Sequence, residues 1–153
     1  MKSFTVEEAV RAVGGEYRGD AKFLKTVVTN VTSDSRTVGK GSLFVAIRGE
    51  RSDGHDYIAP SLAAGAALCI SCREPKDESE TPCVVVGDSV RAVGDLAAWY
   101  RTRFQIPVVG VTGSVGKTTT KEMIYAVLSQ KFRTHKTQKN FNNELGVPQT
   151  LLA

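Results

Sequence analysis

The stretch Val108-Val-Gly-Val-Thr-Gly-Ser-Val-Gly-Lys-Thr-Thr119 predicts a strand, a glycine-rich loop and the start of a helix, in that order. This order is typical of a phosphate-binding loop, in which backbone N–H groups and a helix N-terminus face the phosphates. Lys117 can neutralise phosphate charge and is the candidate catalytic residue, and the Thr118 hydroxyl can bind magnesium. The candidate nucleotide-binding residues are Gly113, Ser114, Val115, Gly116, Lys117, Thr118 and Thr119.

Val111 departs from the general phosphate-loop pattern, which places a glycine five residues before Gly116. The alternative is a tight turn between strand and helix that carries Lys117 on the surface for no chemical reason. An apolar strand before the loop and an amphipathic helix over about 117–130 form the context that favours the phosphate loop.

Strands and helices alternate along the rest of the chain. Thr5-Val-Glu-Glu8 has the form of a capping box, which predicts a helix that ends at Gly14-Gly15. Apolar or alternating runs predict the other strands, and helical spacing predicts the other helices. The expected strands are 26–32, 42–47, 66–71, 83–86 and 132–137, and the expected helices are 56–64, 90–103 and one that begins near 144. This alternation predicts an α/β fold.

Pro107 marks a boundary, after which the strand pattern starts again. We expect residues 1–105 to form a small α/β domain and residues 106–153 to begin a doubly wound nucleotide-binding domain. The second segment is too short for the strands and helices that complete such a domain. The sequence therefore predicts a truncated second domain. A charged loop over 73–80 is expected to be solvated and without function.

Composition excludes few functions. The chain has 153 residues, 41% of them hydrophobic, a formal charge of +4 and three cysteines. No apolar run approaches the roughly 20 residues that span a bilayer, and acidic residues near the N-terminus argue against a signal peptide. We therefore expect a cytoplasmic protein. Cys69 and Cys72 have the spacing of a zinc or redox motif, but on a strand this odd spacing puts them on opposite faces, and no second cysteine pair or nearby histidine accompanies them. We expect reduced structural thiols instead.

Two groups of motifs resemble the Mur ligase family. The loop 112–119, together with Lys121-Glu122 and Asn140-Phe-Asn-Asn-Glu-Leu-Gly-Val-Pro148, is similar to the family's central ATP-binding domain. That family uses a Thr-Gly-x-x-Gly-Lys-Thr-Thr loop without the first glycine, which removes the objection from Val111. The segments 33–36, 41–46 and 49–57 resemble the family's UDP-sugar domain, so the likeness covers nearly the whole chain.

The resemblance implies an activity, cofactors and partners. It is strongest to the type of Mur ligase that uses ATP and magnesium to join D-alanyl-D-alanine to UDP-N-acetylmuramoyl-tripeptide through an acyl phosphate, in peptidoglycan precursor synthesis. A monomer that binds neither nucleic acid nor a membrane is implied. The family's acidic magnesium ligand, carbamoylated lysine and third domain lie beyond residue 153, so the chain alone is expected to be inactive. The substrate-binding residues implied are Asp34, Ser35, Arg36, His55, Asn142, Asn143 and Glu144.

Each of these assignments has a simpler alternative. Asp34 to Arg36 also fit a capped turn with a surface salt bridge, and His55 can close a turn. Asn142 and Asn143 fit helix capping, with Glu144 favoured by the helix dipole. Val115 stands where the family commonly has a small polar residue, which removes a possible side-chain contact.

Three other functions remain open. One is another type of Mur ligase, and a second is a different phosphate-loop enzyme such as a small kinase, which needs a complete sheet and a second acidic magnesium ligand. The third is a module that binds anions or nucleic acid through the basic tract Lys131-Phe-Arg-Thr-His-Lys-Thr-Gln-Lys139. A strand with a solvated basic face explains this tract more simply, so we expect no nucleic-acid binding.

Overall fold

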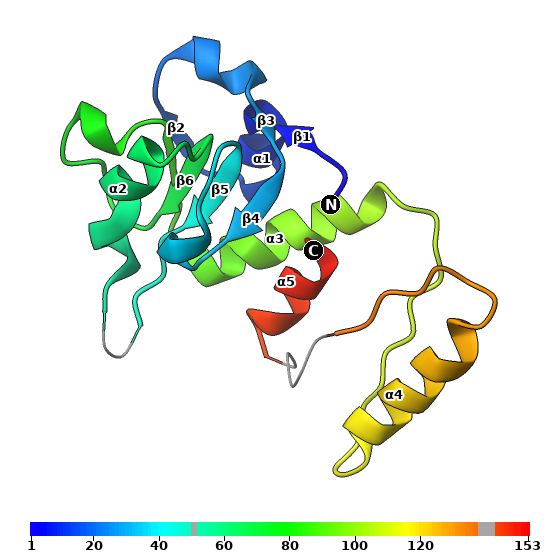
Figure 1. Cartoon of the computed structure of the whole chain (residues 1–153). Helices are drawn as coiled ribbons and strands as arrows, with labels where there is room; N and C mark the ends of the chain where they lie inside the picture. Colours follow the sequence, from blue (N-terminus) through cyan, green and yellow to red (C-terminus); the bar gives the residue numbers. More distant parts are fainter. Residues whose placement is uncertain (50–51, 138–142) are drawn as a thin grey trace.

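The computed structural model describes residues 1–49, 52–137 and 143–153. Its centre is a five-stranded sheet in the order β2-β7-β6-β5-β4 (Figure 1). Four strands run parallel, and β2 pairs antiparallel with β7 at one edge. A separate two-stranded antiparallel sheet joins β1 to β3. The bounds are β1 Phe4–Thr5, β2 Glu16–Arg18, β3 Val27–Val28, β4 Asn30–Thr32, β5 Ser42–Val45, β6 Leu68–Ser71 and β7 Cys83–Val85.

Helices cover both faces of the sheet, as expected where central strands are buried on both sides. Successive residues of a strand point to opposite faces. Thus Leu43 and Val45 of β5 belong to one core cluster, whereas Phe44 belongs to another. The first cluster contains residues of α1 (Val6–Val13) and α3 (Ser89–Thr102), and the second contains Ile58 of α2 (Ile58–Ala63). The expected α/β fold is confirmed.

Local sequence fixes the helix ends. Thr5 and Glu8 form the expected capping box: the Glu8 N–H donates to Thr5 Oγ1 and the Thr5 N–H donates to the Glu8 carboxylate. Gly14 ends α1 in the left-handed conformation, with φ 65°. Four short 3-10 helices fill the connections: η1 Ala21–Lys25, η2 Ser35–Thr37, η3 Gly54–Tyr57 and η4 Glu78–Glu80.

The two helices of the C-terminal third lie in different surroundings. Helix α4 (Lys117–Leu128) stands away from the sheet between two extended segments and contains no buried residue (Figure 1). Helix α5 (Gly146–Leu151) instead packs against α3, and Leu152 reaches the first core cluster. The helix expected near residue 144 is therefore present. The helix after the glycine-rich loop has no fully buried residue, and Lys121 on it donates to the Thr137 carbonyl of the segment that follows.

Two expected strands are absent from the described residues. Segments 108–111 and 132–137 carry no strand, so both expectations are wrong for this structure. A strand needs a neighbour that completes its backbone hydrogen bonds, and these segments find none among the strands described. The run expected over 26–32 divides between β3 and β4, which belong to different sheets. Strand β2 was missed. None of the described helices is long and apolar enough to cross a bilayer.

Candidate functional site

A pocket of about 400 Å³ opens at the edge of the sheet where the parallel strands end. Its lining comes from the segments after β5, β6 and β7 and from the first residues of α3. Ligands of open α/β sheets bind outside the carboxyl ends of the strands, so the topology favours this position. The lining residues are 46–48, 53, 55, 72–73 and 87–90.

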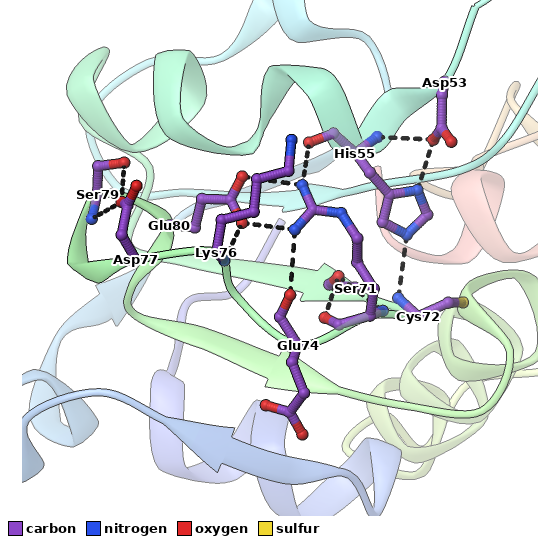
Figure 2. Close-up of polar contacts among 10 residues, drawn as sticks. Asp53, His55, Ser71, Cys72, Glu74, Lys76, Asp77, Ser79 and Glu80 are labelled. Atoms are coloured by element: carbon purple, nitrogen blue, oxygen red, sulfur yellow. Dashed lines mark hydrogen bonds and ion pairs between the residues drawn. The ribbon is translucent and has the colours of Figure 1, made fainter.

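His55 is held between two polar partners at this pocket. Its Nδ1 lies 2.5 Å from Asp53 Oδ1, and its Nε2 lies 3.1 Å from the backbone nitrogen of Cys72 (Figure 2). A backbone N–H can only donate, so Nε2 is the acceptor and Nδ1 carries the proton shared with Asp53. The residue is only 8% exposed. Both ring nitrogens are thus occupied, which leaves only ring carbons for a ligand.

Asp53 organises the turn that presents His55. Its carboxylate accepts hydrogen bonds from the backbone and the ring of His55, and these bonds lower the pKa of Asp53. Between them, Gly54 donates from its backbone to the Ile47 carbonyl at 3.0 Å. A Cβ on Gly54 would lie 2.6 Å from the backbone N and O of Ile47, so this close approach requires glycine.

Arg73 links the pocket to the charged loop that follows it. Its guanidinium donates to both carboxylate oxygens of Glu80 at 2.6 and 2.8 Å and to the carbonyls of His55 and Glu74 at 3.1 Å (Figure 2). Glu80 is 6% exposed and also accepts from the Lys76 N–H. The hydrogen bonds from Arg73 lower the pKa of Glu80 to about 2. The expectation of a wholly solvated loop is therefore wrong, because Glu80 turns inward to meet Arg73.

The N-terminus of α3 forms another side of the pocket, and its first N–H groups already have partners. Asp88 Oδ1 accepts from the N–H groups of Val90 and Arg91 at 2.8 and 3.1 Å. The Ser89 N–H donates to Cys72 Sγ at 3.1 Å, and the Ser89 hydroxyl lies 3.0 Å from the same sulfur. This helix end is satisfied by the protein itself.

The sequence-predicted residues Asp34, Ser35 and Arg36 follow β4 at the same sheet edge but do not line the pocket. Arg36 donates through Nε and Nη2 to the two oxygens of Asp34, at 2.8 and 2.6 Å. These bonds lower the pKa of Asp34 to about 2. The Arg36 side chain is 86% exposed. The geometry is that of a capped turn with an internal ion pair.

Asn143 and Glu144 line a second hollow, of about 660 Å³, between α3 and the start of α5. This hollow shares Asp88 and Val90 with the pocket, so the two are continuous along α3. Asn143 Oδ1 also accepts from the Gly146 N–H at 2.7 Å, as in helix capping. Asn142 lies outside the described residues.

The glycine-rich loop leads into α4 and stands with that helix away from the five-stranded sheet (Figure 1). Gly113 and Gly116 adopt φ 144° and 79°, and Gly116 is the N-cap of α4. Lys117 Nζ bends across the loop and donates to the Gly113 carbonyl at 2.5 Å. Val115 is 90% exposed. A lysine at the mouth of a loop that leads into a helix is chemically compatible with a phosphate ligand, and Thr118 follows it as the second residue of α4.

Several polar pocket residues were not singled out as site residues from the sequence, among them Arg48, Asp53, Arg73, Asp88 and Ser89. Arg48 and Arg73 directly follow the apolar runs that form β5 and β6. Polar residues at the carboxyl ends of parallel strands meet at one edge, so this position was the available signal.

Two protein-family models match the chain, one over its larger central part and one over its C-terminal part. A model described as the Mur ligase family catalytic domain matches residues 27–118, and one described as the Mur ligase middle domain matches residues 111–153. The chain is 50% identical over 126 residues to the UDP-N-acetylmuramoyl-tripeptide–D-alanyl-D-alanine ligase of Synechocystis sp., covering 82% of this chain and 28% of that protein. It is 41% identical over 152 residues to the Escherichia coli ligase of the same name, covering 99% and 32%.

Solved structures agree with these matches. A crystal structure of MurF from Acinetobacter baumannii superposes with a TM-score of 0.88 at 35% identity, covering 99% of this chain and 33% of that one. MurF ligase from Thermotoga maritima, solved in complex with ADP, gives 0.76 at 39% identity, covering 82% and 29%. The chain spans about a third of the length of the relatives that it matches.

Proposed function

Because this chain belongs to the Mur ligase family, we propose that it forms the substrate-binding part and the start of the ATP-binding part of a ligase that joins D-alanyl-D-alanine to UDP-N-acetylmuramoyl-tripeptide. The observation that carries the proposal is the 41% identity, over 99% of the chain, to the Escherichia coli ligase of that name. The complete reaction belongs to peptidoglycan precursor synthesis in the cytoplasm. We propose a monomer that binds no membrane and no nucleic acid.

We propose that the two parts of the chain, divided near residue 105, bind different substrates. Residues 1–105 bind the UDP-linked substrate in the pocket at the carboxyl ends of the strands, and residues 106–153 begin the ATP-binding domain. His55 shapes the pocket through its ring, since both of its nitrogens are occupied. Asp34, Ser35 and Arg36 form a capped turn at the same sheet edge, and this turn would contact the sugar.

In the ATP-binding part, the loop 113–119 would hold the phosphates of ATP. The ADP-bound Thermotoga maritima relative supports this assignment. Lys117 stands across the loop mouth and exchanges its bond to the Gly113 carbonyl for one to a phosphate oxygen. Magnesium, held through Thr118, would supply further neutralisation of phosphate charge.

The reaction requires the pocket for the UDP-linked substrate and the ATP-binding loop to come close together. The terminal carboxylate of the tripeptide attacks the γ-phosphorus of ATP, ADP leaves, and the amine of D-alanyl-D-alanine then displaces phosphate from the acyl phosphate. Phosphoryl transfer depends chiefly on positioning and charge neutralisation, which Lys117 and the loop amides provide. The hollow beside Asn143 and Glu144 continues from the pocket and is the proposed path of the peptide, with Asn142 in the same segment. In this chain α4 stands apart, so we expect no turnover.

Calorimetry on the 153-residue chain tests the proposal. UDP-N-acetylmuramoyl-tripeptide should bind with one site per chain, and ATP with magnesium should bind weakly. Lys117→Ala should weaken ATP binding at least about tenfold, because a charge-assisted bond is lost. Lys131→Ala, an equal change of charge at an exposed position after α4, should leave ATP binding unchanged. A folded chain that binds no uridine nucleotide would overturn the proposal.

A further inference from the structure

Within the described residues, Arg36, Arg48 and Arg73 follow the strands at the sheet edge that carries the pocket, and they differ in their partners. Arg36 is engaged by Asp34, and Arg73 is engaged by Glu80 and by two backbone carbonyls. Arg48 is exposed and lines the pocket, and its side chain makes no hydrogen bond or ion pair within residues 1–49, 52–137 and 143–153. A guanidinium offers five N–H donors, so Arg48 keeps its full capacity for a ligand.

The carboxylate side chains that line the pocket already accept hydrogen bonds from the protein itself. Asp53 accepts from the backbone and ring of His55. Asp88 accepts from the first turn of α3. Neither carboxylate forms an ion pair with Arg48 at 4.0 Å or less in the described part of the chain. The charge of Arg48 therefore remains uncompensated by a direct partner at the pocket mouth.

The other source of positive potential in such a pocket is a helix N-terminus, which often binds phosphate. In α3 this role is already filled, because the N–H groups of Ser89, Val90 and Arg91 donate to Cys72 and Asp88. Among the described residues that line this pocket, Arg48 is the arginine whose whole guanidinium is open to an anionic ligand, because both terminal nitrogens of Arg73 are already bound.

We propose that Arg48 is the specificity-determining residue of the pocket and binds the diphosphate of the UDP-linked substrate. This inference rests on the proposed function, because that function supplies the diphosphate. Arg73, although it lines the same pocket, is a positioning residue whose guanidinium holds His55 and Glu80. A guanidinium fork matches two phosphate oxygens, so Arg48 favours ligands with more phosphate groups.

The experiment is a phosphate series measured by calorimetry on the full 153-residue chain. Uridine, UMP and UDP are titrated into the unaltered protein and into Arg48→Ala, Arg48→Lys and Arg11→Ala. Arg11 is the matched control, since it is an exposed arginine on α1 paired only with Glu7 within the described residues. The unaltered protein and the Arg11→Ala variant should bind UDP more tightly than UMP, and UMP more tightly than uridine.

In Arg48→Ala we expect UDP binding to fall at least about tenfold and uridine binding to stay the same. Arg48→Lys should recover part of the loss, because the charge remains while the fork is removed. A phosphate series that is unchanged in Arg48→Ala would overturn the role of Arg48 and leave the proposed function standing. Absence of any uridine nucleotide binding by the unaltered chain would instead overturn the proposed function.

Discussion

Arg73 and Glu80 form a forked ion pair, with Nη1–Oε2 and Nη2–Oε1 distances of 2.6 and 2.8 Å, and the Glu80 side chain is nearly buried. The same guanidinium holds the His55 carbonyl. The pair thus ties the loop before β7 to the turn that carries His55, and both segments border the pocket.

Removal of Arg73 should destabilise the protein strongly. Arg73→Ala leaves Glu80 buried without its cation, and we expect the free energy of unfolding to fall by about 3–5 kcal/mol. Urea denaturation followed by circular dichroism measures the change. Arg18→Ala is the control, because Arg18 pairs only with the exposed carboxylates of Glu16 and Glu74 within the described residues, and such surface pairs contribute far less to stability. Equal losses in the two variants would contradict the structural role of the buried pair.

The same pair predicts a loss of stability in acid. Arg73 lowers the pKa of Glu80 from 4.5 to about 2, so the folded state releases this proton more readily than the unfolded state. The stabilisation is complete above pH 4.5 and is lost as the pH falls from there to about 2. Thermal unfolding midpoints across this range should fall less steeply in Glu80→Gln. The curve of Glu78→Gln, altered at an exposed carboxylate of the same loop, should stay closer to that of the unaltered protein.

Gly54 is the position where a single methyl group should damage the pocket. In Gly54→Ala the new Cβ would meet the Ile47 backbone, and we expect a loss of about 1–3 kcal/mol from overpacking together with weaker binding of UDP. Gly39→Ala is the control, because a Cβ there meets no atom within 4 Å. Denaturation and calorimetry measure the two effects, and a Gly54→Ala variant as stable as Gly39→Ala would contradict the packing described.

The three cysteines should differ in reactivity. Burial raises the pKa of the Cys69 thiol and raises that of Cys83 to about 11, whereas Cys72 is exposed at the pocket. Because the thiolate is the reactive form, iodoacetamide should modify Cys72 alone in the folded protein and all three residues in urea. Bound UDP should slow the reaction at Cys72. Mass spectrometry that finds Cys69 or Cys83 modified first would contradict the fold.

The sequence alone was enough to predict features that depend on residues close together in the chain. The capping box of Thr5 and Glu8 and the buried strand β5 needed only a few residues of context, and both are present. The glycine-rich loop likewise appears before a helix, with Lys117 across it. These local patterns were enough to predict the α/β fold and the helix after the glycine-rich loop, whereas phosphate binding by that loop stays a prediction.

Features that depend on distant partners were missed. The apolar segment 108–111 reads as a strand, but a strand forms only where another can complete its hydrogen bonds. Glu80 lies in a charged tract where nothing local distinguishes it from Glu78, and only the fold brings Arg73 to it. Likewise, only the fold pairs Arg36 with Asp34 and Arg73 with Glu80, which leaves Arg48 without an ion pair in the described part of the chain.

The central claim is that the pocket at the carboxyl ends of the parallel strands binds the UDP-linked substrate. Titration of the isotope-labelled chain with UDP-N-acetylmuramoyl-tripeptide, followed by amide chemical shifts, tests it most directly. We predict that the largest shifts fall on Arg48, His55, Cys72 and Ser89, with little change at Gly113 or Gly116. Saturable shifts concentrated elsewhere, such as on α1, or no shifts in a folded chain, would contradict the claim.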